Sequence, residues 1–298
     1  MKTRLHRIDS SGTRVRSLDG GGTQPALVML HAGGLCAGVF EPLVHRLGPH
    51  CRPVAIDLRG HGASSAPAKL SDFGYATLAG DVFAVLDELG VQSAFGIGHS
   101  LGGGVLLHAA IERPGFFPRL VVCEAAATSV DPEMLERRVQ RLSAASSRRR
   151  TVWRTPDDLI ERYRAKIPFD RFTLESLQAL ARWGLTIRED NQYELACPPA
   201  VEAGYYATCL SAIGAGTIEH RLPEIPGAGT HCTIVRGLKS PFPEASHQMQ
   251  VDALKGEVFL FDGGHFFPQE DPDLAAQLLK KVLLNDSSPF RRAGQAPR

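Results

Sequence analysis

The sequence lacks the features that mark membrane-spanning, secreted and nucleic-acid-binding proteins. No apolar run reaches the roughly 18 residues that a membrane-spanning helix needs. No apolar segment follows the polar start at 1–7, so no secretory signal is expected. The 33 Lys and Arg nearly balance the 32 Asp and Glu, and the net charge of +1 gives no reason to expect nucleic acid or an anionic membrane as a partner.

Paired cysteines and clustered metal ligands are also missing. The six cysteines are scattered, none of them forms a C-x-x-C pair, and several lie in apolar strand-like runs. This usage predicts buried free thiols in a reducing compartment, and we expect a cytoplasmic protein. No pair of histidines with metal-ligand spacing is accompanied by a third ligand, so neither a metal nor another cofactor is expected.

What the chain does contain is a regular alternation of short apolar runs and helical patterns. Its 298 residues are 43% apolar and 22% charged, which is ordinary for a globular protein. Apolar runs typical of strands buried on both faces lie at 26–30, 53–56, 93–97, 120–123, 232–235 and 257–261. Alternating residues at 4–8 and 13–18 predict an antiparallel hairpin at the sheet edge. The predicted fold class is therefore α/β, with a mostly parallel sheet and helices on both faces.

The alternation breaks after the run at 120–123. From there to about 226 we find helical patterns punctuated by prolines and no convincing strand. The expected helices lie at 133–148, 157–166, 173–183 and 200–213. We therefore predict an all-helical insertion at 128–226 in a core made of 1–127 and 227–286, followed by a polar tail at 287–298.

The most informative stretch is 98–102, which reads G-H-S-L-G and fits the pattern G-x-S-x-G. A short strand pattern precedes it and a buried helix pattern follows, which is the context in which such a serine sits on a sharp turn. The flanking glycines let strand and helix cross closely. The helix dipole and the free N–H of Leu101 favour negative charge beside Ser100. We predict that Ser100 is a nucleophile, the alternative being a glycine-rich turn with an incidental serine.

Four motifs, each at the end of a predicted strand, resemble the α/β-hydrolase family, in its serine hydrolase branch with a helical cap. They are H-A-G-G at 31–34, D-L-R-G-H-G at 57–62, the serine motif, and G-H-F at 264–266. The resemblance extends over nearly the whole chain. It implies an eight-stranded, mostly parallel sheet whose site lies at the carboxyl edge of the strands. It also implies that the insertion after the sixth strand is a cap that covers the pocket.

The resemblance assigns roles to individual residues. Ser100 corresponds to the family's nucleophile and His265 to its general base, since an imidazole must take the serine proton and return it to the leaving group. The oxyanion hole would consist of the backbone N–H groups of Gly33 and Leu101. Ala32 stands where the family usually has glycine, and it keeps the backbone amide.

The acid that orients His265 is where the sequence departs most from the family. The usual Asp, a few residues beyond the strand at 232–235, is replaced by Ser240. Glu124 directly follows the strand at 120–123, at the same sheet edge as Ser100, and an ionisable group there is costly to bury without a partner. We predict Glu124 as the acid of a Ser-His-Glu triad, with Glu244 as the alternative.

Three other histidines lie in the same motifs. His99 is interpreted as a packing residue, because its side chain should point into the fold. His31 and His61 follow strands and are interpreted as residues that brace loops.

The substrate pocket is less well marked. We predict that Gly34, Trp153, Trp183 and Phe266 line it, on the grounds that one or two aromatic residues of the cap should reach the site. The arginine-rich stretch at 137–154 is interpreted as a solvated helix, because charge runs usually face water. A phosphate or carboxylate clamp is the alternative.

The expected function is hydrolysis of an ester or lactone of an apolar small molecule through an acyl-enzyme. Thioester hydrolysis and C–C bond hydrolysis next to a ketone use the same fold, and the sequence leaves them open. A ligand receptor of low turnover is an alternative from another class, since fold alone does not define function. The expected partner is a small-molecule substrate, and the oligomeric state is left open.

Overall fold

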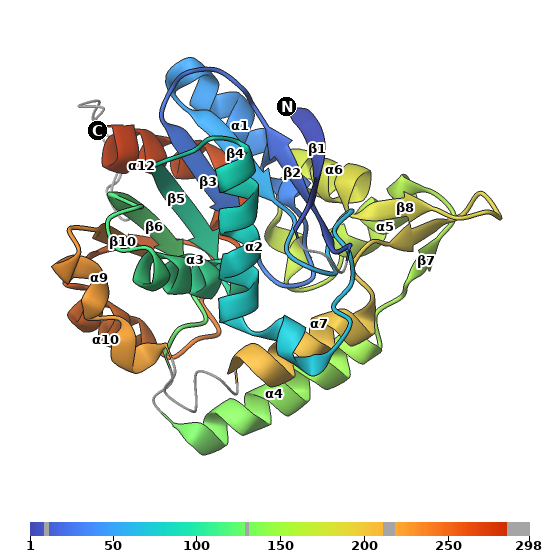
Figure 1. Cartoon of the computed structure of the whole chain (residues 1–298). Coiled ribbons are helices and arrows are strands. Elements are labelled where there is room, and N and C mark those ends of the chain that lie inside the picture. Colours follow the sequence, from blue (N-terminus) through green and yellow to red (C-terminus); the bar gives the residue numbers. More distant parts are fainter. Residues whose placement is uncertain (9–11, 129–130, 211–217, 285–298) are drawn as a thin grey trace, which may run out of the picture.

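A computed structural model describes the chain except for residues 9–11, 129–130, 211–217 and 285–298 (Figure 1). Its centre is an eight-stranded sheet. In sheet order the strands are β1 (Lys2–Arg7), β2 (Arg14–Asp19), β4 (Arg52–Ile56), β3 (Ala26–Leu30), β5 (Ala94–His99), β6 (Arg119–Cys123), β10 (His231–Gly237) and β11 (Glu257–Phe261). The β1–β2 and β2–β4 pairs are antiparallel and the other pairs are parallel, which confirms the predicted sheet with its antiparallel edge.

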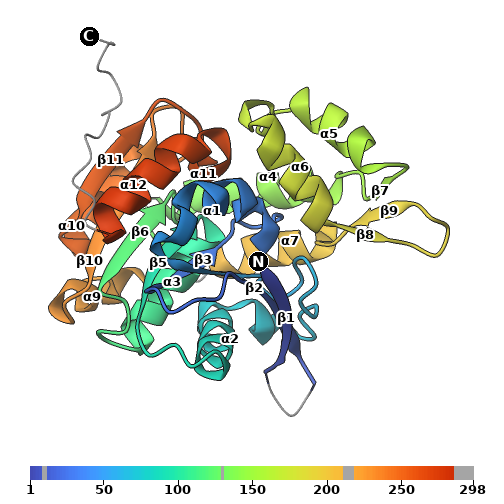
Figure 2. The ribbon, with the colours of Figure 1, turned by 90° about the horizontal axis from the view of Figure 1, so that it is seen from above.

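Helices cover both faces of this sheet. Figure 2 shows α1 (Glu41–Leu47) and α12 (Pro272–Leu284) on one side and α2 (Tyr75–Glu88) and α3 (Leu101–Glu112) on the other. Shorter elements complete the core, namely the 3-10 turns Ala37–Phe40, Gly48–His50 and Leu70–Phe73 and the helices α10 (Glu244–Leu254) and α11 (Phe267–Glu270). The two helical layers bury separate apolar clusters against the two faces of the sheet.

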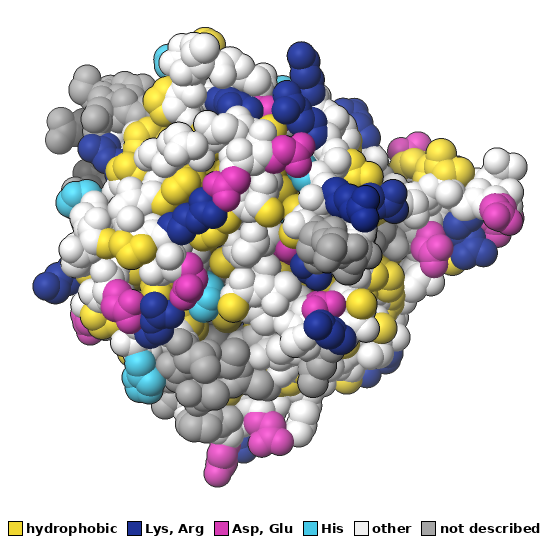
Figure 3. Space-filling view, viewed as in Figure 1, with side chains coloured by type: hydrophobic (Ala, Val, Ile, Leu, Met, Phe, Trp, Pro, Cys, Tyr) yellow, Lys and Arg dark blue, Asp and Glu magenta, His cyan; other side chains and the backbone are white. Residues whose placement is uncertain are grey.

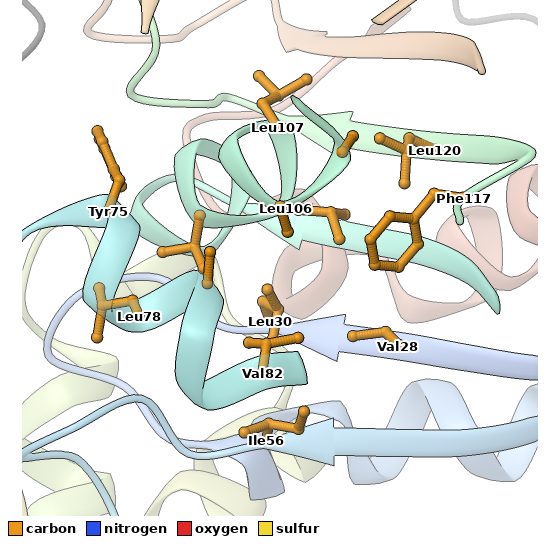
Figure 4. Packing of buried hydrophobic residues seen from close by; sticks show 14 of the residues in the cluster. Val28, Leu30, Ile56, Tyr75, Leu78, Val82, Leu106, Leu107, Phe117 and Leu120 are labelled. Atoms are coloured by element: carbon orange, nitrogen blue, oxygen red, sulfur yellow. The ribbon is translucent and has the colours of Figure 1, made fainter. Parts of the chain in front are cut away.

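The packing follows from the apolar pattern of the sequence. All five residues of β3 are buried, as expected for a strand covered on both faces. In Figure 4, Val28 and Leu30 of β3 point toward the layer formed by α2 and α3. Leu78 and Val82 lie one turn apart on α2 and meet this surface. Burying one such aliphatic side chain contributes about 1.5–3 kcal/mol relative to leaving it exposed.

Between β6 and β10 the chain leaves the sheet and forms an insertion, here defined as residues 131–210. Its helices are α4 (Pro132–Ser147), α5 (Pro156–Arg164), α6 (Leu174–Trp183) and α7 (Pro199–Tyr205), with a 3-10 turn at Phe169–Arg171. The last helix continues into a π-helical turn, Tyr206–Leu210. These elements match the four helices predicted, except that positions 211–213 of the fourth lie outside the described residues.

The prediction of an all-helical insertion is wrong. The strands β7 (Val152–Trp153), β8 (Leu185–Ile187) and β9 (Tyr193–Leu195) form a small antiparallel sheet in the order β7-β9-β8. Strands of two or three residues are too short to show the alternation that identifies a strand in sequence. After the insertion, a 3-10 turn (Glu219–Arg221) and α9 (Glu224–Gly227) return to the core, where Arg221 pairs with Glu112 at 2.8 Å.

Other expectations concern the ends and the surface. The polar tail predicted at 287–298 lies outside the described residues. All six cysteines are buried with free thiols, as predicted. Within the described ranges, no helix combines the length and the apolar character needed to span a bilayer. On the face shown in Figure 3, basic and acidic side chains of the described residues are interspersed.

Candidate active site

Ser100 occupies a sharp turn between β5 and α3. Its φ of +53° lies in the left-handed region, which is unfavourable for a residue with a side chain. A Cβ at position 98 would stand 2.6 Å from the carbonyl oxygen of Gly102, and a Cβ at position 102 would stand 2.3 Å from that of Leu30. Only glycine fits at either position, because strand and helix cross too closely for a side chain. The turn leaves Ser100 partly exposed at the floor of a cavity.

Two backbone amides face the same cavity. Among the described residues, neither the N–H of Gly33 nor that of Leu101 has a hydrogen-bond acceptor. Both residues line the cavity beside Ser100. Free, fixed donors next to a serine are the arrangement that stabilises an oxyanion.

The loop that carries Gly33 is held from below by two buried histidines. His61 Nε2 accepts a hydrogen bond from the N–H of Gly34 at 3.0 Å, while its Nδ1 donates to the carbonyl of Arg59. His31 Nε2 accepts from the N–H of Leu58 at 3.1 Å. Burial lowers the pKa of His61 to about 3, so Nε2 stays an acceptor at neutral pH. The interpretation of both histidines as loop braces is confirmed.

His265 lines the cavity, and Glu124 lies directly behind it. His265 Nδ1 donates to Glu124 Oε2 at 3.3 Å. Glu124 is fully buried and has a φ of +50°, so the backbone turns sharply where β6 ends. The N–H of Gly237 donates to Glu124 Oε1 at 2.8 Å, and the hydroxyl of Ser240 donates to Oε2. The serine found in place of the family's usual Asp thus holds the carboxylate that contacts the histidine.

A second imidazole approaches Glu124 from the other side. His247 Nε2 lies 3.5 Å from Glu124 Oε1, and its Nδ1 donates to the carbonyl of Pro243 at 3.3 Å. Burial alone would raise the pKa of Glu124. The proximity of the imidazoles of His247 and His265 outweighs that effect and holds the pKa of Glu124 well below its ordinary value. Glu124 is therefore a carboxylate at neutral pH.

Aromatic rings and one further histidine fix His265 in place. His99 is fully buried, and its Nε2 donates to the backbone carbonyl of His265 at 2.8 Å. This contact confirms the interpretation of His99 as a packing residue. The rings of Phe266 and Phe242 lie 4.9 and 5.1 Å from the imidazole of His265, centroid to centroid.

The cavity has a volume of about 290 Å³, at the small end for ligand pockets. Of the residues predicted for the site, those that line it are Gly33, Gly34, Ser100, Leu101, His265 and Phe266. Glu124 is not in the wall but behind His265. Glu244 lies away from the site, because its exposed side chain pairs with Arg236 at 3.7 Å. Within the described part of the chain, no three His, Cys, Asp or Glu side chains are grouped so as to hold a metal ion.

The prediction that Trp153 and Trp183 line the pocket is wrong. Trp153 is buried behind Tyr163, whose ring meets it edge-on at 5.7 Å and itself lines the cavity. Trp183 packs so closely over Gly38 that a Cβ there would overlap its ring, and its Nε1 donates to Glu41. Trp153 packs inside the insertion, and Trp183 packs between the insertion and the core. Bulky aromatic residues serve more often in such internal packing than in lining a pocket.

Charged residues of the insertion wall were not among the predicted pocket residues, although a clamp was the alternative interpretation of the arginine-rich stretch. Along α4 and just beyond it, the lining residues are Arg138, Leu142, Ala145, Ser146 and Arg149. Their spacing of three and four residues defines one helix face, which is the signal that could have found them. The solvated interpretation holds for Arg137, Arg141, Arg148, Arg150 and Arg154, which are exposed. It is wrong for Arg138 and Arg149.

Arg149 belongs to a buried polar network of the insertion. Its guanidinium pairs with Glu202 and donates to the hydroxyl of Tyr163 at 2.9 Å. Glu202 also accepts from Ser146 at 2.9 Å and from Tyr206 at 2.7 Å. Burial opposes ionisation of Glu202, but Arg149 outweighs it, and the pKa of Glu202 lies below its ordinary value. The network packs against the backbone at Gly34, where an added Cβ would stand 2.7 Å from Arg149 Nη1 and from Glu202 Oε1.

Comparison with known proteins identifies the family of the chain. A model of the alpha/beta hydrolase family matches residues 27–278. The chain belongs to this family. Among curated relatives of this chain, the pimeloyl-[acyl-carrier protein] methyl ester esterase of Xanthomonas campestris pv. campestris is 42% identical over 96 residues, covering 31% of this chain and 34% of the relative. The aligned segments span only about a third of the length of the first curated relatives.

Several solved structures share the fold along most of the chain. E-2-(acetamidomethylene)succinate hydrolase superposes with a TM-score of 0.78 at 18% identity, covering 95% of this chain and 99% of that one. The enol-lactonase of Burkholderia xenovorans LB400 superposes with a TM-score of 0.68 at 21% identity, covering 94% and 100%. At such identities the likeness shows the fold alone.

Proposed function

We propose that this alpha/beta hydrolase cleaves a carboxylic ester or lactone of a small molecule through an acyl-enzyme, with Ser100 as nucleophile, His265 as base and Glu124 as the orienting acid. The observation that carries the proposal is the contact of Glu124 Oε2 with His265 Nδ1, directly behind a cavity that Ser100 and His265 both line. With Nδ1 bound to the carboxylate, the other ring nitrogen of His265 is the one available for proton transfer.

The reaction would proceed in two balanced halves. In the first, the Ser100 hydroxyl oxygen attacks the carbonyl carbon while its proton passes to His265 Nε2. The amides of Gly33 and Leu101 would stabilise the oxyanion, and the ester C–O bond then breaks as His265 protonates the leaving oxygen. In the second half, water attacks the acyl carbonyl carbon while His265 takes its proton. The bond between the acyl carbon and the Ser100 oxygen then breaks, and His265 returns the proton to that oxygen. Glu124 would stabilise the imidazolium formed in each half.

The names of similar proteins support hydrolysis at a carbonyl group without fixing the bond cleaved. They include a methyl ester esterase, a thioesterase domain, an enol-lactonase and a meta-cleavage product hydrolase. Two features favour an enzyme over a ligand receptor. The amides beside Ser100 have no acceptor in the part of the chain that the structure describes, and the buried carboxylate lies against a cavity-lining histidine.

The test is covalent labelling combined with a substrate panel. A fluorophosphonate should add to Ser100, as located by peptide mass spectrometry, and Ser100→Ala should remove both labelling and turnover while the melting temperature holds. The panel should contain short esters, lactones, thioesters and vinylogous diketones. Labelling at another residue, or turnover retained in Ser100→Ala, would refute the assignment of the nucleophile. A protein that binds but does not turn over any member would support the receptor alternative.

A further inference from the structure

One cation in the cavity wall is not explained by the reaction. Arg138 lies on α4, and its guanidinium stacks on the ring of Phe242 with the central carbon 3.5 Å from the ring centroid. Its Nε is buried and has no hydrogen-bond partner, and Nη1 makes only a 3.5 Å contact with the carbonyl of Pro241. Among the described residues, no carboxylate oxygen lies within ion-pair distance of Arg138. Most of its donor capacity is unused.

Arg149 in the same wall has better acceptors. Its Nε is likewise without a partner among the described residues, but its other donors reach a carboxylate and a tyrosine hydroxyl, whereas Arg138 has an aromatic ring and one distant carbonyl. Burial and the neighbouring Arg141 lower the pKa of Arg138 to about 10, so it is still charged at neutral pH. Withdrawing a charge from water without a partner is unfavourable, so an anion that completes the guanidinium would bind well here.

We propose that Arg138 binds a carboxylate group of the substrate, so that the molecule hydrolysed is an ester or lactone that also carries a free carboxylate. This inference rests on the proposed function and narrows its substrate class. The planar fork of a guanidinium matches a carboxylate through two parallel hydrogen bonds, and its cationic plane remains stacked on the aromatic ring while it does so.

The position of Arg138 fits such a role. The ring of Phe242 packs on both the guanidinium and the imidazole of His265. A carboxylate held by Arg138 would therefore lie one ring away from the base, close enough for the ester group of the same small molecule to reach Ser100. The remaining charged residues of the wall are Lys166, Arg149 and Glu202. Because the last two neutralise each other, the wall facing the substrate carries net positive charge.

The experiment compares matched esters that differ in one charge. One pair consists of the p-nitrophenyl monoester of glutarate and its neutral monoamide, which place the charge on the acyl side. A second pair, the acetate esters of 4-hydroxybutyrate and of its amide, places the charge on the leaving-group side. For each pair we would measure the ratio of kcat/KM for the anionic member to that for the neutral member, in the wild type and in Arg138→Gln.

In at least one pair the ratio should exceed one in the wild type and fall by about 10- to 100-fold in Arg138→Gln, as expected for the loss of a charge-assisted hydrogen bond. The ratio for Arg138→Lys should lie between those of the wild type and Arg138→Gln, because lysine keeps the charge but cannot make two parallel hydrogen bonds. The matched control is Arg137→Gln, because the side chain of Arg137, at the preceding position of the same helix, is 71% exposed. This variant should leave the ratios unchanged.

Two outcomes would overturn the inference, and both differ from failure of the proposed function. The first is a set of ratios that Arg138→Gln does not alter, for example through equal losses on the charged and neutral members, which would make Arg138 a structural residue. The second is a wild-type ratio that does not exceed one in either pair. If the wild type hydrolyses none of the four esters, the proposed function fails instead. Competition by glutarate then tests the inference separately. Glutarate should slow fluorophosphonate labelling of Ser100, and the concentration needed should rise at least tenfold in Arg138→Gln. Glutaramide, which has no charge, should not compete.

Discussion

Two buried carboxylates lie next to the cavity, one behind its core wall and one in its insertion wall, and their partners differ. Behind the core wall, Glu124 contacts two imidazoles, a serine hydroxyl and a backbone amide. In the insertion wall, Glu202 contacts a guanidinium and two hydroxyls. Both carboxyl groups have a pKa below the ordinary range, in spite of burial.

The partners decide what each carboxylate can do. A guanidinium stays charged at all relevant pH values, so near neutral pH the Glu202–Arg149 pair has one charge state and acts as a structural ion pair. The imidazole of His265 can accept a proton during the reaction, so the carboxylate behind it gains interaction energy whenever that ring is protonated. Equal burial and similar pKa directions therefore do not imply equal roles. The comparison predicts that removing one carboxylate impairs catalysis and removing the other impairs folding.

The largest effect is expected from Glu124→Gln. The amide keeps the shape of the side chain but cannot stabilise the imidazolium, and loss of the orienting acid of a serine triad costs on the order of 10⁴ in kcat. Steady-state kinetics on an activated ester would measure this loss. Glu244→Gln, in the alternative position, should be near the wild type because that side chain is exposed. The reverse ranking of the two variants would assign the acid to Glu244.

Glu202→Gln should act mainly on stability. It leaves Arg149 buried without its counter-charge, and breaking one half of a buried ion pair costs about 3 kcal/mol. Urea unfolding should show this loss, with kcat reduced far less than in Glu124→Gln. Glu161→Gln, an exposed glutamate on α5, is the matched control and should be neutral. A loss of kcat in the thousands with stability intact would contradict the comparison.

The same pair gives a pH dependence with a defined sign. The folded-state pKa of Glu202 is lowered, so its contribution to stability is present above the ordinary carboxyl pKa of about 4.3 and is lost as pH falls below it. The difference in unfolding free energy between the wild type and Glu202→Gln should therefore be greatest at neutral pH. It should shrink as the pH is lowered from about 5 toward 3. A difference that is constant over this range would show that the ion pair is not its source.

The difference between the walls also explains what could be predicted from sequence. Ser100, His265 and the loop at Gly33 sit in motifs whose meaning is local, because a strand end and a turn place them without knowledge of the rest. Glu124 could be selected because it follows a buried strand and has no obvious partner nearby in sequence. Its support by Ser240 required the fold, since the two are joined only through adjacent strands.

The insertion wall offered no comparable motif. The run of arginines at 137–154 divides between solvent and cavity by helix face, and only the packing of α4 over the pocket decides which face is inside. The tryptophans were misplaced for a related reason. Their size predicts that they are buried, but the sequence does not distinguish burial against the core from burial against a substrate.

A smaller effect is expected from Ser240→Ala. The hydroxyl of Ser240 donates to Glu124 Oε2 and accepts from the N–H of Phe242 at 3.1 Å, so it orients the carboxylate without touching the substrate. Its loss should lower kcat about tenfold, the order expected for one hydrogen bond to a charged group, with KM unchanged. Ser93→Ala, at an exposed hydroxyl far from the site, is the control. A wild-type kcat in Ser240→Ala would mean that Gly237 and the imidazoles hold Glu124 unaided.

The smallest effect should come from Trp183→Phe, which tests whether the insertion acts on substrate choice only through the residues of its inner face. The indole packs over Gly38 and donates to Glu41, and it does not line the cavity. Phenylalanine keeps most of the packing and loses the hydrogen bond, so the melting temperature should fall by a few degrees. The ratio of kcat/KM between short and longer acyl esters should change less than about twofold, because contacts that do not reach the substrate do not discriminate between substrates. Tyr163→Phe is the informative partner, since that ring does line the cavity and loses its bond to Arg149. If Trp183→Phe shifted the selectivity more than Tyr163→Phe, the outer packing of the insertion, rather than its inner face, would set the shape of the pocket.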